Sequence, residues 1–231
     1  MDPQGADGGV VIRVVLFGAT GMVGQGVLRE ALADPEVERV LSVVRAPTGV
    51  THPKLIELVH PNFYDFTPVY AAFTGYHACL FCLGVSSAGM AEAEYKRITY
   101  DITIAAATAL LHENPAMTFI YISGAGTDAT KKRMWSRVKG ATENALLAMP
   151  FKAAYMFRPG YIQPLHGIKS KTKWTRRMYA AIGWAYPLWK RLFRSYVTST
   201  EELAHAMLYV AKHGAPRPQL EGRDINSFAI R

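Results

Sequence analysis

The stretch FGATGMVGQG, residues 17–26, places glycines at three-residue intervals, at Gly18, Gly21 and Gly24. It lies between an apolar run and a segment with helical spacing, so it predicts a tight turn joining a strand to a helix. In such a turn Gly18 permits the bend, Gly21 lets a phosphate approach the backbone, and Gly24 lets the helix lie close to the sheet. Backbone N–H groups and the positive end of the helix then converge on one point, which predicts a site for the pyrophosphate of a dinucleotide.

Apolar runs and helical patterns alternate along most of the chain. Strands are expected at 11–18, 38–45, 54–60, 77–84, 118–124 and 152–160, and helices at 22–34, 68–75, 91–113, 128–149 and 199–214. Apolar strands that alternate with helices indicate a parallel sheet covered on both faces. We therefore expect an α/β protein with an NAD(P)-binding Rossmann fold, whose parallel sheet is doubly wound.

The domain organisation follows from where this alternation begins and ends. A disordered leader is expected at 1–10 and a single domain at 11–231, with a small C-terminal helical substrate or lid region from about residue 161. Ser199 and Glu202 predict a capping box at the start of the last helix. Beyond that helix we expect a loop with one short strand.

The composition indicates a packed globular protein, because 50% of the 231 residues are hydrophobic and 19% are charged. The leader has no basic region followed by an apolar core, so it does not resemble a secretory signal. The longest membrane-like run, 179–189, contains Pro187 and falls short of the roughly 20 apolar residues that span a bilayer. We expect no transmembrane helix and a cytoplasmic location.

The formal net charge of +8 comes from basic residues concentrated at 131–133 and 169–194. Such a surplus suits nucleic acid, an anionic membrane or a phosphorylated ligand, and it equally suits a solvated basic face. The segment 168–197 interleaves aromatic and basic residues, which favours a lid, a protein contact or a peripheral membrane contact. We expect no nucleic-acid partner, and a monomer and a homodimer both remain open.

Cys79 and Cys82 form a C-x-x-C pair within an apolar run. Residues three apart on a strand point to opposite faces of the sheet, so the two thiols are expected to be separate core residues. No metal site is expected.

The end of the second expected strand indicates which dinucleotide is bound. An NAD-selective site usually has an acidic residue about 20 positions after the glycine loop, at the end of that strand. This chain instead has Arg45 there, which offers a cation to a 2′-phosphate. The sequence therefore favours NADP(H) over NAD(H), although Arg45 also suits a solvated strand end.

Several short motifs occur in the order typical of one family: FGATGMVG, CLG at 82–84, SGAG from Ser123, WSRVKG with a following Glu at 135–143, and RPG at 158–160. In these motifs the chain resembles the short-chain dehydrogenase/reductase (SDR) superfamily. It is most similar to the small atypical NAD(P)H-binding members related to the extended epimerase/dehydratase group. The resemblance covers roughly residues 11–165 and also fits the helix at 198–214.

The resemblance implies contacts from the matching positions to each part of the cofactor. Thr20, Met22 and Val23 would line the pyrophosphate loop with the glycines, Asp65 and the backbone of Phe66 would contact adenine, Cys82, Leu83 and Gly84 would lie beside the adenine ribose, and Pro159 and Gly160 would border the nicotinamide. Substrate would be bordered by Ser86, Ser87 and Tyr161. Asp65 also suits a simple turn.

The resemblance further implies that Ser123 is the catalytic serine and that Lys139 binds the nicotinamide ribose. The two residues also suit a strand-end hydroxyl and a solvated helix charge, but the order of the matching motifs weighs against these interpretations. The family places a tyrosine four residues before the lysine, where both share one helix face and the lysine lowers the tyrosine pKa. Here that position is Trp135. An indole N–H donates a hydrogen bond but does not exchange a proton at neutral pH, so Trp135 cannot be the general acid.

Two hypotheses follow from this replacement. In the first, the protein is an oxidoreductase-like or epimerase-like enzyme in which another group, such as Tyr161, Tyr121 or His166, supplies the proton. Ser123 would then polarise a carbonyl and Lys139 would hold the ribose. In the second, the chain binds NADPH without turnover and acts as a regulatory or scaffold protein. The substrate is not identified by the sequence.

Overall fold

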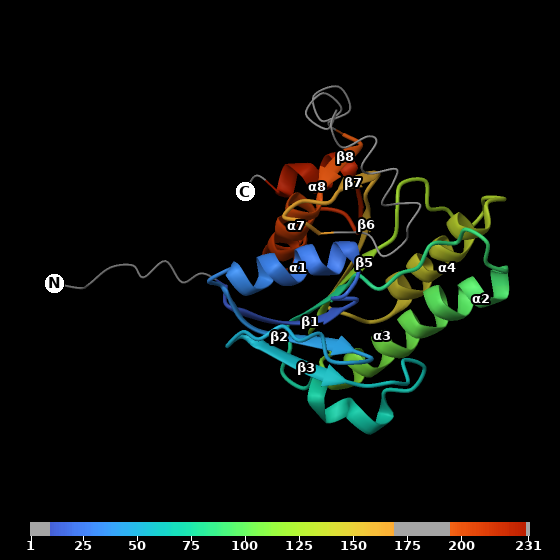
Figure 1. The fold of residues 1–231 in the computed structure, drawn as a ribbon. Coiled ribbons are helices and arrows are strands. Elements are labelled where there is room, and N and C mark those ends of the chain that lie inside the picture. The colour runs from blue at the N-terminus through green and yellow to red at the C-terminus, as the bar shows by residue number, and fades with distance from the viewer. Residues whose placement is uncertain (1–9, 169–194, 230–231) are drawn as a thin grey trace.

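The computed structural model describes residues 10–168 and 195–229. Its centre is a seven-stranded sheet in the order β3-β2-β1-β4-β5-β6-β9, with every pairing parallel (Figure 1). The strands are β1 (Ile12–Phe17), β2 (Val37–Val44), β3 (Leu55–Val59), β4 (Ala78–Phe81), β5 (Thr118–Ile122), β6 (Ala153–Arg158) and β9 (Gln219–Glu221). The predicted doubly wound Rossmann fold is therefore confirmed.

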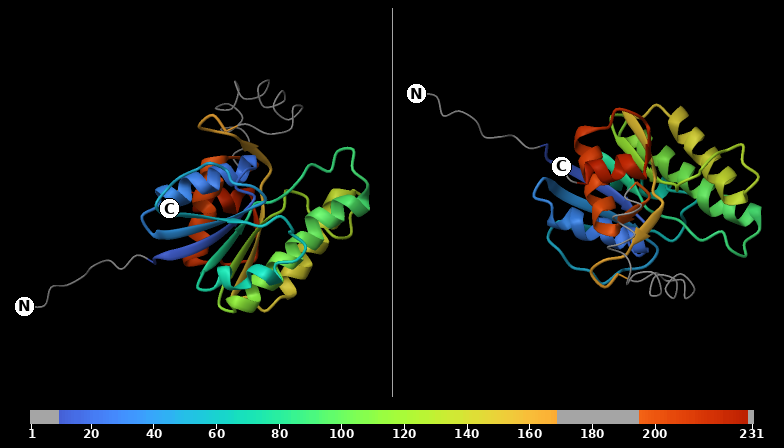
Figure 2. Two further views of the ribbon diagram at one scale, coloured as in Figure 1. Left: turned by 60° about the horizontal axis from the view of Figure 1, so that its bottom comes forward. Right: turned by 90° about the horizontal axis from the view of Figure 1, so that it is seen from above.

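Helices cover both faces of the sheet (Figures 1 and 2). One face carries α1 (Met22–Ala33), α7 (Thr200–His213) and α8 (Gly222–Phe228). The other carries the 3₁₀ helix η1 (Thr67–Phe73), α2 (Glu92–Lys96), the π-helical turn η2 (Arg97–Asp101), α3 (Ile102–Glu113) and α4 (Met134–Ala148). Each interface has its own apolar core, one built around Val14, Leu16 and Val27, the other around Val15, Phe17 and Phe81. Alternate residues of β1 feed the two cores, as the period of two in a strand requires.

The side of β1 on which successive strands are added to the sheet changes between β3 and β4. Strands β2 and β3 lie to one side of β1, and β4, β5 and β6 lie to the other. In sheets of this type, ligands bind outside the carboxyl ends of the strands at such a switch point.

Several local expectations are confirmed. Ser199 and Glu202 form the predicted capping box of α7, in which the Ser199 hydroxyl accepts from the Glu202 N–H at 3.1 Å. Cys79 lies in the core that contains Phe17 and Cys82 packs against the other core, so the thiols are on opposite faces and are not bonded to each other.

Four expectations need correction. The expected helix at 128–149 starts only at Met134, because Asp128 accepts hydrogen bonds from both the backbone N–H and the hydroxyl of Thr130 and holds a turn there. The expected helix at 91–113 contains the π turn η2, and the short helix expected at 68–75 is 3₁₀.

The fourth correction concerns the C-terminal loop. It contains helix α8, which starts with a capping box between Glu221 and Asp224. A two-stranded parallel sheet of β7 (Tyr161–Gln163) and β8 (Val197–Ser199) was not expected either.

Two expectations lie largely outside the described residues: the leader at 1–10 and the basic aromatic segment at 168–197. Within the described ranges, no helix combines the length and apolar composition needed to cross a membrane.

Gly140 fixes how α4 lies against the loop that follows β5. A Cβ at Gly140 would lie 2.2 Å from the backbone nitrogen of Ala129, which is far inside van der Waals contact. We expect Gly140→Ala to destabilise the fold by about 1–3 kcal/mol, as overpacking does in cores. Thermal unfolding of Gly84→Ala is the matched control, because a Cβ at Gly84 meets nothing within 4 Å. Equal melting temperatures for the two variants would contradict this role for Gly140.

Candidate functional site

The glycine turn after β1 is packed by protein on two sides and left open on the third. At Gly18, where φ is +83°, a Cβ would lie 2.6 Å from the backbone nitrogen of Leu83, so this turn lies directly against the chain leaving β4. At Gly24 a Cβ would lie 2.0 Å from the Gly18 carbonyl oxygen. A Cβ at Gly21 would meet only the Gly18 oxygen, at 3.3 Å. Gly18 and Gly24 are thus required for packing, whereas Gly21 leaves room for a ligand.

The N-terminus of α1 offers unpaired hydrogen-bond donors at this opening. Gly21 is its N-cap, no side chain caps it, and its first turn holds no acidic residue. The backbone N–H of Gln25 donates to the Gly21 carbonyl at 2.9 Å, which leaves the N–H groups of Met22, Val23 and Gly24 at the free helix end. Free donors and the positive helix end together fit the negative charge of a diphosphate.

An aromatic cluster holds the loop after β3 against the same end of β1. The ring of Phe17 packs against those of Phe63, Phe66, Phe73 and Phe81, with centroids 5.2–6.5 Å apart. Next to Phe66, the carboxylate of Asp65 accepts from the Thr67 backbone N–H at 2.9 Å. Hydrogen bonds from the Thr67 hydroxyl and N–H lower the pKa of Asp65. Asp65 therefore acts as a turn residue and stays ionised, and a carboxylate oxygen has capacity for a further donor.

Arg45 directly follows β2 and its side chain is exposed. It makes no hydrogen bond or ion pair with any other residue in the described ranges. The loop beyond it is fixed independently, because the backbone N–H and the hydroxyl of Thr48 donate to the Glu57 carboxylate of β3. The guanidinium is thus available to an anion from outside the chain.

Lys139 of α4 is anchored at the carboxyl end of β5. Its Nζ donates to the carbonyl oxygens of Ser123 at 2.5 Å and Ile122 at 3.3 Å. Burial lowers the pKa of Lys139 to about 8, and the nearby Glu143 carboxylate partly opposes this shift. The ammonium group therefore lies at the edge of the sheet where the strands β1, β4 and β5 end.

Trp135 lies one turn before Lys139 on the same helix and reaches the same strand end. A Cβ placed on Gly124 would be 4.0 Å from Cζ3 of the Trp135 ring. Ser136 fixes the start of the helix, since its hydroxyl donates to the Gly126 carbonyl at 2.7 Å and accepts from the Asp128 N–H at 3.0 Å. The indole thus occupies the space beside the end of β5.

Ser123 is buried and its hydroxyl hydrogen is already used. The side chain donates to the carbonyl oxygen of Phe157 on β6 at 3.1 Å, and the residue is 6% exposed. A hydroxyl has a single hydrogen, so in this arrangement Ser123 does not offer one to a substrate carbonyl. The hydroxyl would have to rotate to polarise a substrate.

Two of the alternative proton donors are unsuited to the task. Tyr121 is 1% exposed within the core, and burial raises its pKa far above the ordinary value. The imidazole of His166 bonds Glu201 at the start of α7. Tyr161 lies on β7 and its hydroxyl donates to Gln163 at 2.8 Å. Of these three residues Tyr161 is the remaining candidate acid, and like Ser123 its hydroxyl would have to rotate away from its present acceptor to serve a substrate.

The remaining predicted site residues also follow the carboxyl ends of strands. Those after β4 are Cys82, Leu83, Gly84, Ser86 and Ser87, and those after β6 are Pro159 and Gly160. Ser86 is exposed and its hydroxyl accepts from the Ala88 N–H at 3.3 Å. The Ala125 N–H donates to the Pro159 carbonyl at 2.9 Å and joins the ends of β5 and β6. The residues predicted to contact cofactor or substrate therefore lie at or near the carboxyl ends of the strands.

The sequence did not predict the ion-pair network near the carboxyl end of β6. Arg158 of β6 forms a two-pronged bond with the Glu143 carboxylate, at 3.0 Å and 2.5 Å, and a third bond with Glu221 at 3.1 Å. Glu143 is 1% exposed, so the pair is a buried link between α4, β6 and β9. Both residues lie in motifs noted above, but their pairing requires the folded structure.

Comparison with known proteins agrees with this geometry. A family model described as NAD(P)H-binding matches residues 18–156, which is more than half of the chain. Among curated relatives, the chain is similar to protein fmp52, mitochondrial, of Emericella nidulans, with 28% identity over 162 residues, 64% of this chain and 66% of that protein. It is also similar to protein FMP52, mitochondrial, of Saccharomyces cerevisiae, with 26% identity over 163 residues, 69% of this chain and 68% of that protein.

The match to the Emericella protein spans slightly less than two thirds of that relative's length. The names of both relatives contradict the cytoplasmic location expected above, because they describe mitochondrial proteins. A leader with no secretory pattern was therefore a poor guide to the compartment.

Solved structures share the fold at low sequence identity. The Bordetella bronchiseptica enzyme WbmF in complex with NAD+ has a TM-score of 0.65 at 14% identity, covering 94% of this chain and 77% of that one. The NADPH-bound carbonyl reductase from chicken fatty liver has a TM-score of 0.61 at 15% identity, covering 93% and 97%. The family match runs from the glycine turn through β5, and together with these shared folds it leads to one conclusion: the chain belongs to the NAD(P)H-binding family.

Proposed function

We propose that this chain is a mitochondrial NADP(H)-binding protein of the atypical SDR type, oxidoreductase-like or epimerase-like, whose proton transfer does not use the family's tyrosine. One observation carries the proposal: Trp135 occupies the tyrosine position, one turn before Lys139, and reaches the end of β5. The names of the curated relatives support the compartment.

The proposed cofactor site consists of hydrogen-bond donors and cations at the carboxyl ends of the strands. The free N–H groups of Met22, Val23 and Gly24 would hold the diphosphate, and the exposed guanidinium of Arg45 would pair with the 2′-phosphate. Asp65 would accept a hydrogen bond from adenine, since its carboxylate remains ionised and exposed. Lys139 of α4 would donate to the nicotinamide ribose from its position beside the end of β5.

The proton-transfer half is where this chain departs from its family. A bound nicotinamide supplies or accepts a hydride, and the protein must manage the accompanying proton. The Trp135 indole orients a polar group without exchanging its proton, and the Ser123 hydrogen is held by the Phe157 carbonyl. Tyr161 or a water molecule would therefore provide the proton, at a rate below that of a tyrosine whose pKa is lowered by a neighbouring lysine.

The same observations support a second candidate function, a non-catalytic NADPH-responsive regulatory or scaffold protein. Cofactor binding needs the glycine turn, Arg45 and Lys139, whereas turnover also needs a proton donor. Because both Trp135 and Ser123 are poor donors, the chain can retain binding with little or no reaction.

Cofactor preference tests the role of Arg45. We expect wild-type protein to bind NADPH more tightly than NADH, and Arg45→Ala to weaken NADPH binding by about 10- to 100-fold, the usual range for a hydrogen bond to a charged group, with little change for NADH. Nicotinamide fluorescence titration gives both dissociation constants. Arg223→Ala is the matched control because Arg223 is an exposed residue of α8. Equal affinity of the wild type for both cofactors would remove the proposed role.

The pH dependence of binding tests Lys139. Its pKa of about 8 means that the ammonium is charged below pH 8 and is lost above it. Because the charged form is the better donor to the ribose, NADPH affinity should be constant below this pH and fall above it, by up to about tenfold per pH unit. Calorimetric titration between pH 6.5 and 9.5 measures the effect. Lys139→Met should bind more weakly and show no such step, and a step retained in that variant would assign the titration to another group.

Restoring the family residue tests the missing acid. We expect Trp135→Tyr to raise NADPH oxidation on a panel of carbonyl compounds by about 10²-fold or more, the usual contribution of a general acid. Trp135→Phe is the control, since it removes the indole without adding a hydroxyl. An equal gain in both variants would attribute the effect to space, and rapid turnover by the wild type would exclude the regulatory candidate.

A further inference from the structure

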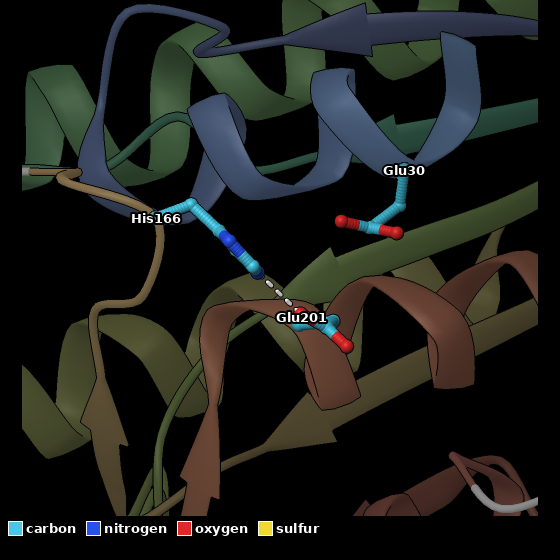
Figure 3. Close-up of side chains that lie close together, drawn as sticks. All are labelled: Glu30, His166 and Glu201. Atoms are coloured by element: carbon cyan, nitrogen blue, oxygen red, sulfur yellow. Dashed lines mark hydrogen bonds and ion pairs between the residues drawn. The ribbon is translucent and has the colours of Figure 1, made fainter. Parts of the chain in front are cut away.

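A cluster of carboxylates and imidazole lies on the α1–α7 face, away from the cofactor site. Glu30 comes from the third turn of α1, His166 from the loop after β7, and Glu201 from the first turn of α7. Their potential ligand atoms all lie within 4.8 Å of one another, and the three side chains point into the same space (Figure 3). These residues are remote in sequence, so the fold brings them together.

Among the described residues, the charges in this cluster do not balance. Within residues 10–168 and 195–229, Arg29 is the single permanent cation paired with it, with Nη1 2.6 Å from Glu30 Oε1 and 3.7 Å from Glu201 Oε2. Glu30 is only 9% exposed, and its other oxygen lies 3.0 Å from Nε2 of His205. Two carboxylates therefore face one guanidinium and two histidines, which leaves a charge of −1 when the histidines are neutral. Adjacent carboxylates in a half-buried site favour a further cation.

The backbone at His166 has an uncommon conformation. His166 is the single non-glycine residue with positive φ, 55°, among residues 10–168 and 195–229. This left-handed conformation costs of order 1–3 kcal/mol and persists where surrounding contacts maintain it. The adjoining contacts are specific, since the Leu165 N–H donates to the Thr200 hydroxyl at 3.2 Å and Gly26 lets α1 pack on Thr200. The strained residue carries the imidazole that reaches Glu201.

We propose that Glu30, His166 and Glu201, with His205 beside them as a fourth donor, bind one zinc ion or a similar divalent transition metal. Imidazole nitrogen and carboxylate oxygen are ligands that zinc accepts at about 2.0–2.2 Å, which sets tetrahedral donors roughly 3.3 Å apart. His166 and Glu201 are now closer than this, as are His205 and Glu30 at 3.0 Å, and the ligand atoms of Glu30, His166 and Glu201 all lie within 4.8 Å of one another, so side-chain rotations would be needed to form the site. Arg29 would keep Glu30 Oε1, while Oε2 turns to the metal.

The bound ion would join three segments and would fix the loop after β7 to α1 and α7. Since a metal that binds only the folded state stabilises it by mass action, zinc should raise the melting temperature. Ligands must be deprotonated, so affinity should decline below the pH at which histidine becomes charged.

Zinc titration of the full-length, untagged, chelator-treated protein tests the proposal. Calorimetry should give one equivalent with a dissociation constant in the micromolar range or tighter, and zinc should raise the melting temperature by a few degrees, reversed by EDTA. Cobalt substitution should give visible absorption bands of a four- or five-coordinate site. No stoichiometric binding would overturn the proposal.

Matched variants identify the site. His166→Gln and Glu201→Gln should each weaken zinc binding at least tenfold, with folding checked by circular dichroism. His112→Gln should not, because His112 pairs with Glu113 at 2.8 Å on α3 and is outside the cluster. Arg29→Gln removes the competing cation and should tighten zinc binding. Equal losses in the His166 and His112 variants, or weaker binding in the Arg29 variant, would mean that the cluster is an ion-pair network alone.

Discussion

The close approach of α1 to the turn after β1 is the constraint on which the rest of the structure depends. A Cβ at Gly24 would lie 2.0 Å from the Gly18 carbonyl, and one at Gly18 would lie 2.6 Å from the backbone after β4. Because glycine has no side chain, the N-terminus of α1 and the carboxyl ends of β1 and β4 can meet at one point. This contact places the free N–H groups of α1 at the carboxyl ends of β1 and β4, while Gly26 further along the helix lets α7 pack against α1 at Thr200.

Local patterns predicted this part of the molecule well, and the reason is physical. The glycine turn, the alternation of the strands and the Ser199–Glu202 cap are decided by residues close in sequence. The separation of Cys79 from Cys82 follows from the pleat of a single strand. The π turn at Arg97–Asp101 was missed because it lies inside a continuous helical pattern, and helix α8 was missed although its Glu221–Asp224 capping box is a local signal. The direction of the Ser123 hydroxyl and the partner of His166 were missed because each depends on a residue more than 30 positions away.

The compartment illustrates a different limit. Targeting is not a property of the folded core, and the absence of a secretory pattern says little about other destinations. The names of the curated relatives corrected the expected cytoplasmic location, which physical reasoning about the chain could not test. The fold could therefore be predicted from the sequence more completely than the cellular compartment of the protein.

The arrangement around β5 separates two tasks that the family usually combines. Lys139 is held by carbonyl oxygens of β5 and can serve a bound ribose whichever residue precedes it by one turn. In the proposed function, the position one turn earlier governs proton transfer, and Trp135 fills it with a side chain that donates a hydrogen bond without exchanging a proton. Binding and reaction would then depend on different residues of one helix. On this proposal the absence of the tyrosine lowers turnover while cofactor binding is retained, because Gly140 and Ser136 position α4 through their own contacts with the loop after β5.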